Sequence, residues 1–134
     1  MISTRDRIIQ VTSELLETQG YHGTGLNQIV AESGAPKGSL YHYFPEGKEE
    51  LTIEAISRSG RDIAARIRAS LAGVDDAAEA VCSFILTVAT YVEASGYSAG
   101  GPVTTVALET ASTNERLSAI CKGVYDLWQG AFAE

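Results

Sequence analysis

The residues best suited to chemistry lie in one segment, GAPKGSLYHYFPEGKEEL, at positions 34–51. Lys37 and Lys48 supply cations there, and the residues around Lys37 are small. The chain carries a formal net charge of −7, yet the single carboxylate between positions 18 and 45 is Glu32. Cations without acid nearby suit phosphate groups, and small residues let a helix approach base edges closely. The segment therefore predicts contact with nucleic acid.

The sequence lacks the patterns that favour catalysis or metal binding. Cys82 and Cys121 lie far apart in apolar segments, where we expect both to be reduced core residues. His22 has no second ligand-type residue near it. No nucleophile pairing, His–carboxylate helix spacing or phosphate-binding glycine loop occurs. We expect neither an enzyme nor a metal or cofactor site.

Composition indicates an ordinary globular protein. The chain has 134 residues, of which 45% are hydrophobic and 20% charged. This length suits one domain, or a small domain followed by part of a second. We find no apolar run of the roughly 18 residues that a membrane span needs, and no signal-peptide core near the N-terminus. We expect a cytoplasmic protein without a membrane partner.

Wherever hydrophobic residues recur at a clear spacing, the spacing is that of a helix, which predicts an all-α fold. The first two helices are expected to end at Gly20 and Gly34. The third begins near Pro36, because a first helical turn does not need the N–H group that proline lacks. Leu40 and Phe44, four residues apart, define its buried side.

Four further helices are predicted in the second half of the chain. A long helix begins at about Lys48, and the next follows Asp76. Two more begin at Pro102 and Asn114. An apolar stripe on the helix after Asp76 is expected to be core, and it consists of Ala78, Val81, Ile85, Val88 and Val92.

Two short helices joined by a tight turn at Gly34, with a helix on each side, are the plan of a helix-turn-helix. The stretch TGLNQIVAESGAPKGSLYHYFPEGKEEL, residues 24–51, resembles the DNA-binding signature of the TetR family of transcriptional regulators. With the helix order before and after it, the resemblance covers about the first half of the chain.

The resemblance implies a three-helix DNA-binding domain at residues 1–47 and a helical effector-binding and dimerisation domain at residues 48–134. The positions implied to lie near bases are Ala35, Pro36, Lys37 and Gly38, with the small Ser39 beside them. The positions implied to hold the phosphate backbone are Thr24, Tyr41, His42 and Lys48. For His42, a solvent-facing role is an equal alternative.

The resemblance also implies a homodimeric repressor that a small, mostly apolar effector releases from a palindromic operator. The stretch GGPVTTVALETA, residues 100–111, is similar to the ligand domain of a subgroup related to regulators of drug-efflux genes. Apolar walls with a few polar groups are typical of such a pocket. The candidate lining residues are Phe84, Tyr91, Cys121, Tyr125 and Trp128.

Two alternatives stay open. The chain could be a helical-bundle small-molecule binding protein without DNA binding, and this alternative predicts that Lys37 and Tyr41 are buried. Family members also run on for two more helices that pair with those of a partner. We therefore expect either a truncated or partly ordered form of a longer protein, or dimerisation through other surfaces.

Overall fold

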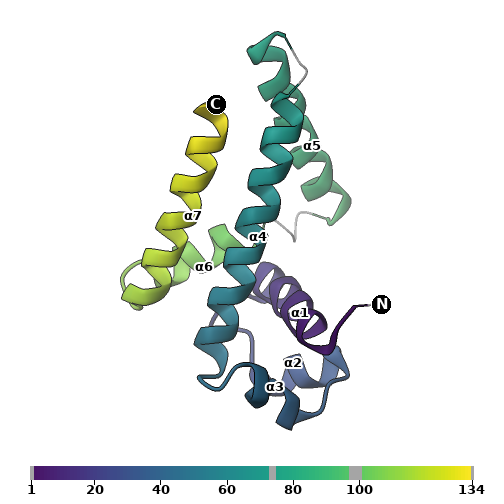
Figure 1. Ribbon diagram of the computed structural model, residues 1–134, viewed down its shortest axis with the longest axis vertical. Coiled ribbons are helices and arrows are strands. Elements are labelled where there is room, and N and C mark those ends of the chain that lie inside the picture. The colour runs from purple at the N-terminus through teal and green to yellow at the C-terminus, as the bar shows by residue number, and fades with distance from the viewer. Residues whose placement is uncertain (1, 73–74, 97–100, 134) are drawn as a thin grey trace.

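The computed structural model describes residues 2–72, 75–96 and 101–133, and these ranges contain seven α-helices and no strand. The helices are α1 (Thr4–Gln19), α2 (Leu26–Ser33), α3 (Lys37–Tyr43), α4 (Lys48–Leu71), α5 (Ala77–Ala94), α6 (Pro102–Thr110) and α7 (Glu115–Ala133). Figure 1 shows α4 as the long central helix, with α1, α2 and α3 around its first half and α5 and α7 beside its second. The predicted all-α class is confirmed.

The predicted helix ends agree with the structure to within about a residue. α1 and α2 end at Gly20 and Gly34, whose φ angles of 78° and 70° are readily adopted only by glycine. Asp76 accepts hydrogen bonds at the start of α5, and Asn114 Oδ1 accepts one from the N–H of Leu117 at the start of α7. Local sequence therefore sets most of the element boundaries.

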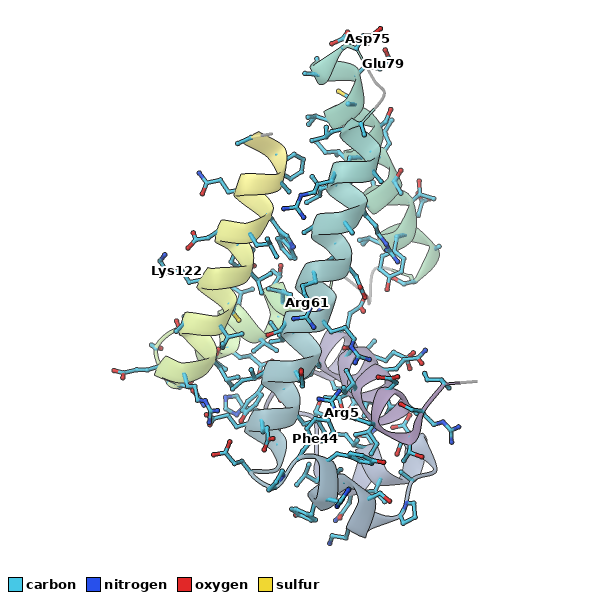
Figure 2. All side chains as sticks on the ribbon, viewed as in Figure 1. Arg5, Phe44, Arg61, Asp75, Glu79 and Lys122 are labelled. Atoms are coloured by element: carbon cyan, nitrogen blue, oxygen red, sulfur yellow. The ribbon has the colours of Figure 1, made fainter. Side chains whose placement is uncertain are left out.

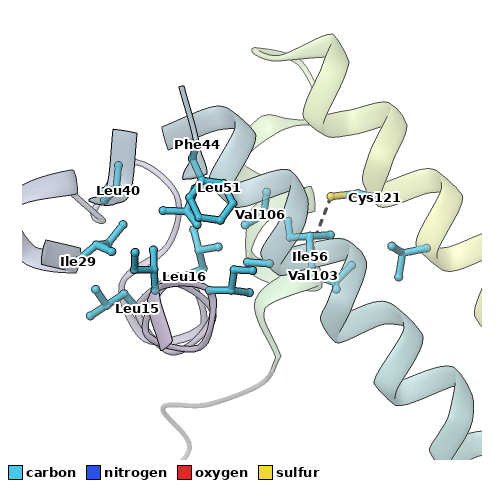
Figure 3. Packing of buried hydrophobic residues seen from close by; sticks show 14 of the residues in the cluster. Leu15, Leu16, Ile29, Leu40, Phe44, Leu51, Ile56, Val103, Val106 and Cys121 are labelled. Atoms are coloured by element: carbon cyan, nitrogen blue, oxygen red, sulfur yellow. Dashed lines mark hydrogen bonds between the residues drawn. The ribbon is translucent and has the colours of Figure 1, made fainter. Parts of the chain in front are cut away.

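One hydrophobic core joins α1, α2 and α3 to α4 and α6 (Figure 3). Leu40 and Phe44 are each 1% exposed, which confirms the predicted buried side of α3. Val103 and Val106 of α6 belong to the same cluster. Full burial of such side chains contributes about 1.5–3 kcal/mol each. The core thus crosses the predicted boundary between residues 47 and 48.

The side chain of Arg5 on α1 contacts the edge of this core. Its guanidinium carbon lies 5.2 Å from the ring centroid of Phe44, and its Nη2 lies 3.4 Å from the carboxylate of Glu54. Figure 2 labels Arg5 and Phe44. The long side chain of an arginine can cover an apolar edge while its charge stays near water. Arg5 therefore links α1 to both α3 and α4.

The prediction of a buried apolar stripe on α5 is wrong. Ala80 is the single buried residue among the helix positions, and Ile85 and Val88 are 57% and 46% exposed. α5 packs chiefly against α4, and its further contacts are single side chains, such as Phe84 beside Phe132 of α7 and Tyr91 hydrogen-bonded to Glu17 of α1. An amphipathic period indicates which side of a helix is apolar, but burial also needs an element to cover that side.

The expectation of no membrane-length apolar run is also wrong. Residues 77–94 form a helix with a mean hydropathy of 1.4. By length and composition alone, this helix is long and apolar enough to span a membrane. One such helix is a weak indication, because core helices of soluble proteins pass the same test.

The two cysteines differ from each other. Cys121 is buried, and its thiol lies 4.0 Å from the carbonyl oxygen of Val103. Burial raises the pKa of this thiol. Cys82 is exposed on α5, so the expectation that it is a core residue is wrong.

Candidate nucleic-acid interface

The first turn of α3 forms an open surface. Pro36, Lys37 and Gly38 are all exposed, and a Cβ atom added at Gly38 would meet nothing within 4 Å. Tyr41, one turn further along, is 45% exposed. Burial of Lys37 and Tyr41, which the alternative without DNA binding predicts, is therefore not found.

Two of the predicted DNA-binding residues have buried side chains. Ala35 is 7% exposed and belongs to the hydrophobic core, because the turn at Gly34 directs it inward. Thr24 is 2% exposed, and its hydroxyl donates to the carbonyl of Gly20 at 2.7 Å. In this conformation their side chains support the helix-turn-helix and do not face outward.

The end of α3 presents an aromatic pair. The rings of His42 and Tyr43 meet edge to face with centroids 5.0 Å apart, and both side chains are exposed. Ser39 is half-buried on the same helix. Tyr43 is not among the predicted DNA-binding residues, and the structure places it 38% exposed beside His42. The exposure of Tyr43 could have been predicted from its position one residue before the buried Phe44, since adjacent residues of a helix point in different directions.

Lys48 begins α4 but is less open than Lys37. Its ammonium nitrogen lies 4.2 Å from the ring centroid of Tyr21. Partial burial lowers the pKa of this ammonium, and the nearby carboxylate of Glu109 acts in the opposite direction. Lys48 is thus a cation held against an aromatic face at a helix N-terminus.

The acidic residues that follow Lys48 are occupied by other groups of the chain. Glu49 accepts hydrogen bonds from Asn114 and Arg116 at 3.2 and 3.4 Å. Glu50 accepts one from the backbone N–H of Glu46 at 2.9 Å. These contacts direct both carboxylates toward intramolecular partners.

A separate cavity of about 560 Å³ lies between α4 and α5. Phe84 and Tyr91, two of the five predicted lining residues, contribute to its wall together with Ile63 and Val88. The volume falls within the roughly 300–1,000 Å³ of small-molecule sites. The two aromatic residues of α5 therefore line one cavity, and their role in binding a ligand stays a prediction.

The other three predicted lining residues face elsewhere. Cys121 lies in the core, the Tyr125 hydroxyl is 3.1 Å from that of Thr104 on α6, and Trp128 Nε1 donates to the Gly60 carbonyl on α4 at 2.9 Å. Their prediction as lining residues is wrong for this cavity, because α7 packs them against α4 and α6.

Sequence reasoning missed the polar wall of the cavity. Glu17 of α1 lines it and accepts a 2.7 Å hydrogen bond from the Tyr91 hydroxyl, a contact that raises the pKa of Tyr91. Asp62 and Arg66 of α4 also line it. Glu17 lies outside the predicted effector domain, and no local signal connects it with α5.

Two family models match the chain. The model described as bacterial regulatory proteins of the tetR family matches residues 8–55, and that of the LmrA/YxaF-like transcriptional regulator C-terminal domain matches residues 77–134.

Curated relatives match along almost the whole chain. The uncharacterized HTH-type transcriptional regulator YxaF of Bacillus subtilis is 45% identical over 97% of this chain and 68% of its own length. The HTH-type transcriptional regulator LmrA of the same bacterium is 38% identical over 98% of this chain and 70% of its own.

Among solved structures, the reduced form of Escherichia coli NemR superposes on this chain with a TM-score of 0.85 and 19% sequence identity. The match covers 96% of this chain and 66% of the NemR chain. At this identity the likeness shows the fold alone. The chain spans about two thirds of the length of these three relatives.

Proposed function

Because the chain belongs to the TetR family of bacterial regulatory proteins and is a DNA-binding transcriptional regulator, we propose that it is a cytoplasmic repressor. It binds a palindromic operator as a homodimer and is released by a small, mostly apolar effector. We assign it no catalytic role.

The observation that carries this proposal is the open first turn of α3. Pro36, Lys37 and Gly38 are exposed, and no carboxylate lies in α3. A recognition helix placed in the major groove would bring this turn to the base edges. Tyr41 and His42 would then lie toward the phosphates, together with Lys48 at the start of α4.

The cavity supports the effector part of the proposal. Phe84, Tyr91 and Ile63 supply aromatic and aliphatic walls, and Glu17 and Asp62 supply acceptors. Such a site suits a ligand with an apolar body and a few hydrogen-bonding groups.

Helix α6 connects the cavity with the DNA-binding helices. Gly101 and Pro102, at its start, line the cavity, and Glu109 in its last turn contacts the loop after α1. A ligand that shifts α6 would therefore act on the helix-turn-helix through a rigid element.

An electrophoretic mobility assay with the DNA upstream of the chain's own gene tests the proposal. We expect retardation that weakens steeply as salt rises, because bound lysines displace counterions from phosphates. A random duplex of equal length should bind more weakly. Absence of salt-sensitive binding to the upstream fragment would contradict the repressor function and favour the alternative of a small-molecule binding protein.

A further inference from the structure

The carboxylate of Glu109 binds two consecutive backbone groups outside its own helix. Oε1 accepts the N–H of Tyr21 and Oε2 accepts the N–H of His22, each at 2.9 Å. Both groups lie just after α1, in the loop that leads into the helix-turn-helix. A carboxylate that accepts two N–H groups makes stronger hydrogen bonds than a neutral acceptor. Glu109 therefore fixes this loop from α6.

The loop is shaped to admit the carboxylate. Gly20, immediately before Tyr21, has φ of 78°, and a Cβ atom added there would collide with the carboxylate of Glu109. Glycine thus serves two needs at this position, a positive φ and a close approach.

Tyr21 connects this contact with the candidate DNA interface. Its half-buried ring is the surface on which the Lys48 ammonium rests, 4.2 Å from the centroid. Among the described residues Lys48 has no ion-pair partner within 4.0 Å, although the carboxylate of Glu109 is near enough to raise its pKa. The ammonium is held in place by an aromatic face and stays available to an anion.

We propose that Glu109 is a positioning residue for DNA binding, which holds Tyr21 as the platform that orients Lys48 toward a phosphate. The inference rests on the proposed function, since the phosphate contact of Lys48 belongs to it. It adds that a residue of α6, far from α3 in the sequence, sets the strength of that contact.

Salt dependence distinguishes this role from a merely structural one. Each phosphate contact contributes about 0.9 to the slope of log affinity against log salt on duplex DNA. We would measure this slope for wild type, Glu109→Gln, Lys48→Met and the double variant, on a duplex selected from a random pool by the wild-type chain. Glu115→Gln is the matched control, because Glu115 is exposed at the start of α7.

We expect Lys48→Met to lower the slope by about one. Glu109→Gln should lower it by a similar amount, because the amide has one acceptor oxygen for two N–H groups. Loss of the carboxylate charge near Lys48 would by itself strengthen phosphate binding, so a lower slope reports lost positioning. The double variant should match Lys48→Met, and Glu115→Gln should match wild type. Tyr21→Leu removes the ring but leaves the Glu109 contact, so it should lower the slope by the same amount. This variant replaces Glu109→Gln as the test if Glu109→Gln does not fold.

A wild-type slope for Glu109→Gln, or a loss of affinity that adds fully to that of Lys48→Met, would overturn the positioning role while the repressor function stands. An unchanged slope for Lys48→Met would overturn it too. If the wild-type chain selects no duplex at all, the proposed function fails and this inference fails with it.

Discussion

Lys37 and Lys48 are both cations of the candidate DNA interface, but their surroundings give them different tasks. Lys37 is exposed on the first turn of α3, whereas Lys48 is half-buried against Tyr21. An exposed lysine loses rotamer freedom when it binds, and a pre-ordered one loses less. We therefore expect Lys37 to contribute mainly to the choice of sequence and Lys48 mainly to affinity.

Replacement of Lys37 by alanine should weaken operator binding by about 1–3 kcal/mol and relax the preference at one base position, as expected for a base contact. Titration of the operator and of single-base variants measures both effects. Lys122→Ala is the control, because Lys122 is an exposed lysine of α7, away from α3 in Figure 2, and pairs with Asp126. Equal losses for the two variants would argue against a base contact.

The Tyr41 hydroxyl gives a second prediction at this scale. Tyr41→Phe removes one hydroxyl from an exposed side chain, so the folded structure should be unaffected. If the hydroxyl donates to a phosphate oxygen, binding to all sequences should weaken by a similar factor. Titration against the operator and a random duplex would show it. A loss confined to the operator would instead indicate base recognition.

At the scale of elements, α4 and α7 pack closely at one small residue. Gly60 is buried on α4, and a Cβ atom added there would lie 2.7 and 2.9 Å from the two γ-methyl carbons of Val124 on α7. Trp128 donates its indole N–H to the Gly60 carbonyl beside this contact. A glycine within a long helix costs helix propensity, so its presence here is explained by the close approach.

Gly60→Ala should therefore destabilise the protein by about 1–3 kcal/mol, despite the better helix propensity of alanine. Gly123→Ala on α7 is the matched control, because nothing lies within 4 Å of an added Cβ atom there. It should stabilise the protein by about 0.5–1 kcal/mol. Urea denaturation of both variants measures these changes, and a stabilising Gly60→Ala would show that α7 can move away.

At the scale of the whole molecule, the DNA-binding helices and the rest of the chain form one connected structure. α6 contributes Val103 and Val106 to the core of α1 and α3, and Glu17 of α1 lines the cavity beside α5. Asn114 and Arg116 further bind Glu49 of α4. These contacts run in both directions, so the proposed effector would have a physical route to α3 through packed elements.

A homodimeric repressor places two recognition helices about a two-fold axis, so its operator should be a palindrome. Hydroxyl-radical footprinting of the upstream fragment should show two equivalent protected half-sites. The distance between their centres should be about one helical turn or a multiple of it. A single protected site would contradict binding as a symmetric dimer.

The sequence by itself determined the helices and predicted a recognition surface. Several residues mark helix ends through their own backbone and capping preferences, namely Gly20, Gly34, Asp76, Pro102 and Asn114. The same holds for α3, whose buried side follows from the spacing of its apolar residues. These properties depend on residues a few positions apart, so they can be predicted without the fold.

Only the tertiary structure decided which of these surfaces are covered and which distant residues meet. The apolar side of α5 and Cys82 are exposed, while the small Ala35 and the polar Thr24 are buried. Glu109 reaches Tyr21 across 88 positions, and Glu17 reaches Tyr91 across 74. Burial and long-range hydrogen bonds depend on how helices pack together, and a helical period carries no information about the partner.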